Sequence, residues 1–254
     1  MVSFVPQLDV PAMTVAIMSL LVHEFAHISL VRVFGGGVSG FRISFLGATA
    51  WVHGLENLKL WQRYAIYLAG PAVNALFAVG AWAAARFLCG IAETVFLYNI
   101  VLCVFNLLPV FPLDGGRLVQ LFLGNRIGIL RANRLLLKTG PVLGSVLIAL
   151  GVVQAVLYPW NITLLCAGVY IHRKNKQMPT QLYWECIKAL QAKTTRPLPT
   201  KKIILPKDTT LKQAVEYLGW DYFAEIQVGA GCYISEKELL ESILSSATTN
   251  QPAS

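Results

Sequence analysis

The feature that most limits how this chain can fold is the scarcity of acidic side chains in a long apolar N-terminal part. Residues 1–172 contain five acids, whereas residues 173–254 contain the other eight. Over the whole chain 56% of residues are hydrophobic and 13% are charged, which is about half the charge of an average soluble domain. We therefore expect a membrane part over residues 1–172 and a smaller soluble part after it.

Two other classes of protein fit this composition poorly. The five cysteines are scattered without a CxxC pair, so neither a disulfide framework nor a cysteine-based metal site is expected. The formal net charge of +8 would suit a nucleic-acid-binding protein. The basic residues, however, gather at the ends of apolar runs, where they orient membrane spans. We expect no nucleic-acid partner.

Five apolar runs predict about five transmembrane helices, so the expected fold class is an α-helical polytopic membrane protein. The runs cover residues 10–34, 63–88, 92 into 106–117, 140–158 and 160–172. The first run lacks the basic start of a cleavable signal peptide and is expected to remain in the mature chain. The last is shorter than the roughly 20 residues that a full crossing needs. Residues 35–54 are rich in glycine and β-branched residues, which predicts strand-like, re-entrant structure at the membrane face.

The basic residues also predict the orientation of these spans. With the C-terminal tail in the cytoplasm and the N-terminus outside, nine of the ten Lys and Arg residues of the membrane part lie at cytoplasmic ends. Only Arg86 falls outside. This bias predicts a multi-pass protein of the bacterial cell membrane with that topology.

Within the predicted spans the pattern HEFAH places His23, Glu24 and His27 in the first apolar run. On a helix, His23 and His27 lie one turn apart on the same face, so both imidazoles can bind one metal ion. Glu24 is offset from that face, and it can reach a water molecule on the metal as a general base. The alternative is a pair of buried structural histidines beside a buried glutamate, although an idle glutamate is costly in a membrane.

A catalytic zinc site uses three protein ligands and an open position, so a third ligand must come from another span. Asp114 is the remaining carboxylate at a suitable depth. It follows the run that Pro109 and Pro112 must break, and it precedes Gly115 and Gly116, which let the backbone turn. Asp114 can alternatively cap the helix that follows, and both roles are compatible.

Together, HEFAH and NLLPVFPLDGGR (residues 106–117) resemble the two signatures of the site-2 protease family, in its sporulation branch. The resemblance implies a zinc-dependent intramembrane endopeptidase, with Asp114 as the aspartate ligand. AGPAVN (69–74) is similar to the family's second-span motif, which implies that Asn74 faces the active site and helps to stabilise the oxyanion. Residues 40–52 correspond to the family's membrane hairpin, which would hold an unwound substrate as an added strand.

The family resemblance also implies partners and a setting. The substrate would be a membrane-tethered precursor of the sigma-factor type, cut during sporulation, and membrane proteins would inhibit the enzyme. Family members usually have another transmembrane helix ahead of the HExxH helix, whereas nine residues precede it in this sequence. Either this branch has lost that span or the start is trimmed. The site is expected toward the cytoplasmic side.

The tail divides into a basic linker over residues 173–200, a small α/β domain over 201–244 and a disordered end over 245–254. The linker is expected to contain one helical stretch at residues 181–192. The domain's predicted order of strand, helix, strand, strand and helix is similar to one CBS module, and a generic α/β domain is the alternative. A single module implies a homodimer through the tail and binding of ATP, with Asp208, Thr209 and Thr210 at the helix start as contacts.

Two other functions use similar residues. A metal or proton transporter also keeps histidine and aspartate in the membrane, but it does not need Glu24 beside the first histidine. A catalytically inactive homologue acting as a chaperone or scaffold would not need the full set of chemical residues that this sequence carries.

Overall fold

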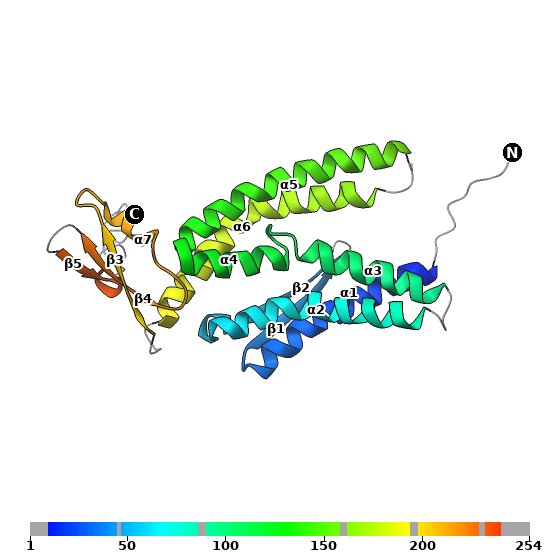
Figure 1. Ribbon diagram of the computed structural model, residues 1–254, viewed down its shortest axis with the longest axis horizontal. Coiled ribbons are helices and arrows are strands. Elements are labelled where there is room, and N and C mark those ends of the chain that lie inside the picture. The colour runs from blue at the N-terminus through cyan, green and yellow to red at the C-terminus, as the bar shows by residue number, and fades with distance from the viewer. Residues whose placement is uncertain are drawn as a thin grey trace, which may run out of the picture. The chain divides into compact units, whose positions relative to one another are not determined.

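The structure, a computed structural model, describes residues 10–44, 47–85, 90–157, 162–193, 198–228 and 232–239. Its chain forms two compact units (Figure 1). The first consists of Met1–Leu118 and Leu136–Pro179, and the second of Val119–Leu135 and Thr180–Ser254. The second unit therefore includes a stretch before residue 136 that the sequence assigns to the membrane part.

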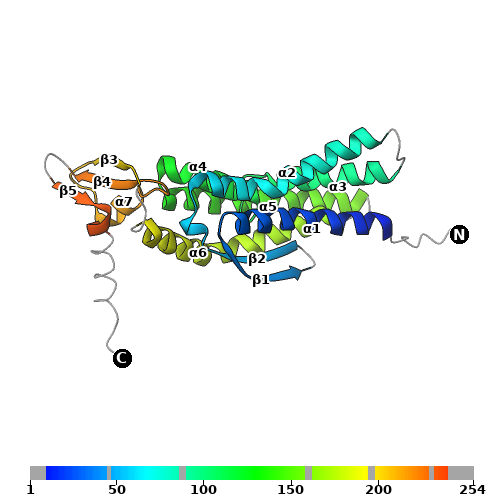
Figure 2. The ribbon, with the colours of Figure 1, turned by 90° about the horizontal axis from the view of Figure 1, so that it is seen from below.

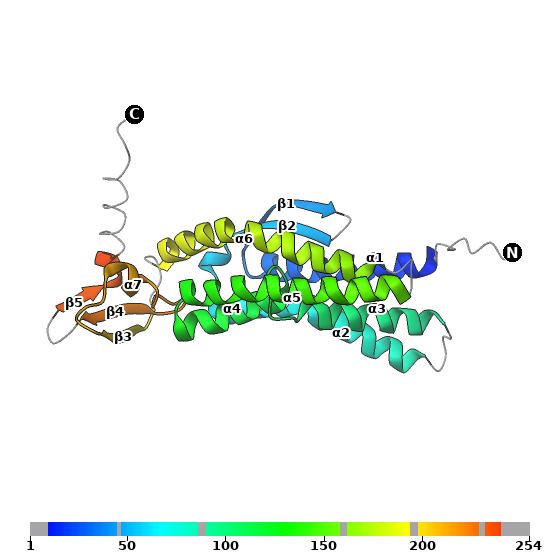
Figure 3. The same ribbon diagram turned by 90° about the horizontal axis from the view of Figure 1, so that it is seen from above.

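Three helices of the first unit pack against one another (Figures 1 and 3). They are α1 (Val10–Val33), α2 (Leu60–Ala84) and α3 (Ile91–Asn106). Large apolar side chains such as Phe25, Leu76 and Trp82 are exposed on them, as expected of helices whose outer faces meet lipid. Among the described residues, three helices are long and apolar enough to cross a membrane: Pro11–Val33, Leu60–Ala84 and Ile129–Leu157.

The last two predicted spans correspond to α5 (Ile129–Leu157) and the first part of α6 (Thr163–Lys193). Helix α6 corrects the prediction for residues 173–193, because it continues as one helix where the sequence was interpreted as a linker with a separate helix. Residues 173–178 (RKNKQM) contain no glycine and mostly favour helix. Pro179 is accommodated within the helix. The basic residues of this segment therefore mark a solvent-exposed part of α6, and they do not mark the end of a helix.

Helices α5 and α6 run side by side in Figures 1 and 3. Small residues allow the close approach: a β-carbon at Gly168 would lie 2.8 Å from the carbonyl oxygen of Gly144. Gly151 likewise faces the backbone of Leu165. Such close glycine contacts between helices are typical of membrane bundles, where packing replaces the hydrophobic effect.

The predicted strand-like segment forms a hairpin beside α1 (Figure 2). Strands β1 (Gly37–Ser44) and β2 (Gly47–His53) are antiparallel, and the register shifts between Val38 and Gly40. Val31 of α1 and Ile66 of α2 form a buried cluster with Leu58, and hairpin residues pack against it. After the hairpin, the short η1 turn (Leu55–Asn57) leads into α2. The strand prediction is confirmed for the described residues.

The predicted break after the third apolar run is also confirmed. Helix α3 ends at Asn106, and α4 (Asp114–Ile127) begins at the predicted ligand. Val110 and Leu113, in the segment between them, are buried against Ile171 of α6. The Phe111–Pro112 peptide bond is cis. The packing fixes the start of α4 within the first unit.

The second unit contains a three-stranded sheet. Strand β4 (Phe223–Val228) lies between β3 (Thr200–Leu205), which is parallel to it, and β5 (Cys232–Ser235), which is antiparallel. The short helix α7 (Leu211–Val215) connects β3 to β4. The order strand, helix, strand, strand agrees with the sequence prediction. Its identity as a CBS module stays a prediction.

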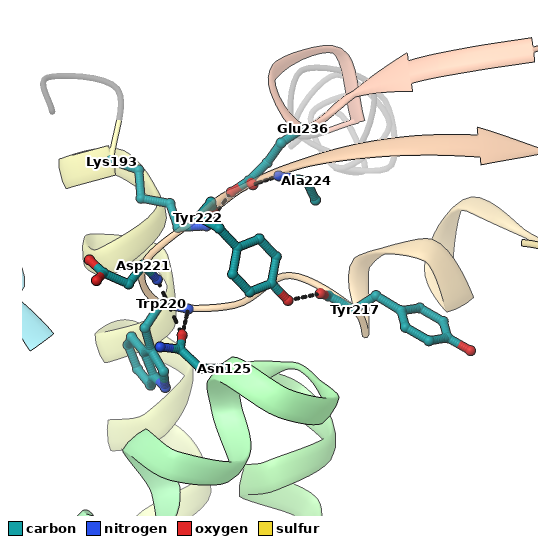
Figure 4. A network of polar contacts seen from close by, with 8 residues as sticks. All are labelled: Asn125, Lys193, Tyr217, Trp220, Asp221, Tyr222, Ala224 and Glu236. Carbon is teal, nitrogen blue, oxygen red and sulfur yellow. Dashed lines mark hydrogen bonds and ion pairs between the residues drawn. The ribbon is translucent and has the colours of Figure 1, made fainter. Parts of the chain in front are cut away.

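A network of polar contacts surrounds the segment that leads into β4 (Figure 4). Lys193 Nζ, at the end of α6, donates to the carbonyl of Tyr222 (2.8 Å) and pairs with Glu236 (2.7 Å). Asn125 Oδ1, near the end of α4, accepts from the backbone N–H groups of Trp220 (2.9 Å) and Asp221 (3.2 Å). These contacts show why the end of α4 belongs to the second unit.

Candidate metal centre

Three side chains predicted as metal ligands converge in the first unit. Nε2 of His23 lies 3.1 Å from Nε2 of His27. Oδ2 of Asp114 lies 3.2 Å from each of these nitrogens. Within the described parts of the chain, this is the group of His, Cys, Asp and Glu side chains that could hold a metal ion. The structure thus brings together residues that are 91 positions apart in the sequence.

The local sequence explains this convergence. The four-residue spacing puts His23 and His27 on one face of α1, and their rings meet edge to face at a centroid distance of 4.8 Å. Asp114 is the first residue of α4. It is held there by the packed segment before it, so its carboxylate faces the two rings.

The three donor atoms fit zinc. A tetrahedral zinc with bonds of about 2.0–2.1 Å holds its ligands about 3.3–3.4 Å apart, close to the 3.1–3.2 Å sides of this triangle. Hydrogen bonds alone satisfy the arrangement poorly. In a neutral ring His27 donates through Nδ1, so its Nε2 carries a lone pair that faces the carboxylate oxygen of Asp114, 3.2 Å away, with no proton between them. A cation between the three donors removes that repulsion.

The two histidines are oriented differently. Nδ1 of His27 donates to the backbone carbonyl of Ile66 in α2, at 2.6 Å. A hydrogen bond from Nδ1 to a carbonyl fixes the tautomer of the ring and leaves Nε2 free to bind the metal. Nδ1 of His23 is buried and has no hydrogen-bond partner within the described ranges. The sequence motif predicted both ligands, but it contained no signal for the Ile66 carbonyl, because a backbone group leaves no residue pattern.

Glu24 lies beside the metal centre and outside the ligand triangle. Its carboxylate is close enough to interact electrostatically with His27, His23 and Asp114. Glu24 is not part of the group of possible metal ligands, and its role as a base stays a prediction. Tyr170 of α6 also interacts electrostatically with Glu24, and no sequence motif indicates this contact.

Asn74 is fully buried in α2, and neither its amide oxygen nor its amide nitrogen has a partner among the described residues. Gly70, one turn earlier, points its α-carbon at the two imidazoles, since a β-carbon there would meet both rings. Residues four apart share a helix face, so Asn74 lies on the side of α2 that borders the metal centre. Its role at the oxyanion stays a prediction.

The predicted nucleotide contacts belong to the second unit, whereas the metal ligands belong to the first. Asp208 and Thr210 are exposed in the segment before α7. The Thr210 hydroxyl accepts a hydrogen bond from the Gln213 N–H, and the Gln213 side chain accepts one from the Thr210 N–H. This capping box uses one of the two acceptor positions of the Thr210 hydroxyl.

Known proteins resemble this chain in sequence and fold. Residues 83–150, which contain Asp114, match the model of peptidase family M50. Stage IV sporulation protein FB of Bacillus subtilis is 30% identical over 131 residues, covering 50% of this chain and 46% of that protein. A zinc metalloprotease of Methanocaldococcus jannaschii is 20% identical over 210 residues, covering 79% of this chain and 58% of that protein. The chain thus spans about half the length of these curated relatives.

A solved structure has the same fold. The site-2 protease from Methanocaldococcus jannaschii superimposes with a TM-score of 0.54 at 22% identity, covering 66% of this chain and 76% of that one. Family model, curated relatives, fold and ligand geometry agree. In sequence and in fold, this chain is therefore similar to the site-2 protease family of metalloproteases, peptidase family M50.

Proposed function

We propose that this protein is a zinc-dependent endopeptidase that cleaves a membrane-associated protein within or beside the bilayer. The observation that carries the proposal is the convergence of His23, His27 and Asp114 at 3.1–3.2 Å. The two histidines and Glu24 lie on α1, which is long enough to cross a membrane. Ionisable groups within such a helix are costly unless they have a function.

The residues divide the chemistry between them. His23, His27 and Asp114 would hold the zinc, which when bound supplies the Lewis acidity that acidifies water and polarises a scissile carbonyl. Glu24 takes the proton from the attacking water and delivers it to the leaving amine. Asn74, buried with an unpaired amide, donates a hydrogen bond to the oxygen on which negative charge develops.

The substrate must present an extended backbone to this site, because a helix hides its peptide bonds. Strands β1 and β2 lie against α1, the helix of both histidines. A free edge of this hairpin would bind an unwound substrate segment as an added strand. Main-chain hydrogen bonds would then hold the peptide in register.

The biological substrate we propose is a membrane-tethered sigma-factor precursor cut during sporulation, with membrane proteins as inhibitors. The support is the similarity to stage IV sporulation protein FB. We further propose five crossings in the bacterial cell membrane, with the N-terminus outside and the tail in the cytoplasm. Reporter fusions at residues 90, 125 and 200 test this topology: the first should report outside and the others inside.

For the second unit we propose a nucleotide-responsive module that dimerises the protein. Its support is the order of β3, α7, β4 and β5, which is similar to the CBS order. ATP contacts would fall to Asp208 and Thr209 first, since Thr210 caps α7. Titrating ATP against the full-length enzyme tests this proposal. A monomer whose cleavage rate does not respond to ATP would contradict it.

The proteolytic function is tested by co-expressing the protein with membrane-tethered candidate precursors. Wild type should release a truncated product, and Glu24→Gln should not. A metal transporter would retain zinc-dependent uptake in that variant, because transport does not require the base. Unchanged product release with Glu24→Gln would refute the assigned mechanism.

A further inference from the structure

Gly70 lies inside α2 (Leu60–Ala84), directly before Pro71. Glycine and proline are the two poorest residues for a helix interior, so this pair needs a local reason. The atoms nearest to a β-carbon built at position 70 all belong to the imidazole rings of His23 and His27. Position 70 therefore faces the metal centre and not a neighbouring helix backbone.

The space beyond the Gly70 α-carbon is the space that the metal centre needs. A β-carbon would lie 2.5 Å from Nε2 and Cε1 of His23, and closer still to Nε2 of His27. Ordinary non-bonded contacts between such atoms are about 3.5 Å or more. The same two nitrogens would bind zinc at about 2.0–2.1 Å. A methyl group would thus compete with the ion and its remaining ligand.

We propose that Gly70 is a positioning residue of the metal centre, where the bare α-carbon leaves room against α2 for the ion and its non-protein ligand. This inference rests on the zinc site proposed above. Gly70 contributes no donor atom, yet a single methyl group at this position should weaken binding of the metal. Gly70 and Asn74 lie one turn apart on the same face of α2. A scissile carbonyl would therefore approach the metal centre along this face.

The same helix supplies a matched control. A β-carbon at Gly80 would have no atom within 4 Å. Gly70→Ala and Gly80→Ala therefore change helix propensity in the same way, and only the first fills the metal centre. Zinc affinity is measured by chelator competition on the purified full-length protein in detergent. We expect Gly70→Ala to weaken binding at least tenfold and Gly80→Ala to stay within twofold of wild type. An affinity for Gly70→Ala within twofold of wild type overturns the proposal.

A second measurement separates this clash from general misfolding. In metal-free protein, Gly70→Ala should lower Tm because the methyl group presses on the two rings. In a His23→Ala/His27→Ala background the rings are gone, so the same substitution should no longer lower Tm. Failure to fold in the first background with folding in the second also supports the clash. An equal loss of Tm in both backgrounds shows that the methyl group meets something else, which contradicts the proposal.

These readouts do not depend on a protease assay. Wild-type protein that binds zinc but cleaves no candidate precursor would contradict the proposed substrate and leave the Gly70 result intact. If wild type binds zinc and cleaves, and Gly70→Ala binds zinc as tightly as wild type, only the positioning role of Gly70 is contradicted.

Discussion

Nδ1 of His27 donates a 2.6 Å hydrogen bond to the backbone carbonyl of Ile66. The bond joins α1 to α2, so the orientation of this ligand is fixed by the packing of two helices and not by the metal. The carbonyl is part of a helix backbone and cannot be removed by a side-chain substitution. We therefore expect the packing of α1 against α2 to hold His27 in place without the ion, in contrast to small zinc domains that fold around their metal.

Removing zinc should accordingly leave the fold intact. After treatment with a chelator, we expect the helical signal in circular dichroism to remain unchanged and cleavage to be lost. Adding zinc should restore cleavage without a refolding step. Loss of helical signal on chelation would show that the metal holds the bundle together.

Glu24→Gln should abolish cleavage and keep the zinc. The amide has nearly the same shape but cannot accept a proton, and general bases contribute about 10²–10⁴-fold to rate. Metal analysis of the purified variant should give the same zinc content as wild type. A variant depleted of zinc would mean that Glu24 is a ligand.

Asp114→Asn should lose both zinc binding and cleavage. The substitution keeps the size of the side chain but removes the charge that helps to hold the ion. We expect zinc content and cleavage to fall together, whereas Glu24→Gln separates them. Normal cleavage by Asp114→Asn would exclude the three-ligand site.

Several features of the site were predictable because they depend on local spacing. The interval of four residues between His23 and His27 fixes their common face in any helix. Pro109 and Pro112 predict the break that precedes Asp114. The structure keeps α3 and α4 separate at that point.

Other features depend on which segments meet in three dimensions, which spacing does not encode. The Ile66 carbonyl acts through the backbone, so no side-chain pattern indicates it. The AGPAVN motif indicated Asn74, but it did not show that the α-carbon of Gly70 meets the two imidazoles. The charged residues 173–178 were interpreted as a linker, whereas they form part of α6. The grouping of Val119–Leu135 with the tail arises from contacts such as Asn125 with Trp220, which join distant parts of the chain.

The buried ion pair of Lys193 and Glu236 should be sensitive to loss of one partner. Both side chains are almost fully buried, and burial lowers the pKa of Lys193 while Glu236 opposes that shift. Glu236→Gln leaves the ammonium without its counter-charge and should cost about 3–5 kcal/mol. The double variant Lys193→Met/Glu236→Gln should recover part of this loss. Denaturation of the full-length protein measures both, and an additive double variant would contradict the coupling.

Glu216 provides a test by pH. Its carboxylate accepts hydrogen bonds from Arg134 at 2.6 Å and from Arg131 at 3.1 Å. The hydrogen bond from Arg134, helped by that from Arg131, holds the pKa of Glu216 below its ordinary value of 4.5. Because folding favours the ionised form, this stabilisation is present above pH 4.5 and is lost as the pH falls through the lower pKa of the folded protein.

Glu216→Gln cannot ionise, so it isolates this contribution. We expect the difference in Tm between wild type and Glu216→Gln to be constant from pH 7 to about pH 5 and to shrink as the pH falls below about 4.5. The difference should also shrink in high salt at neutral pH, since the pair with Arg134 is exposed on the arginine side. A difference in Tm that does not change with pH would show that the arginines bind the carboxylate without depending on its charge.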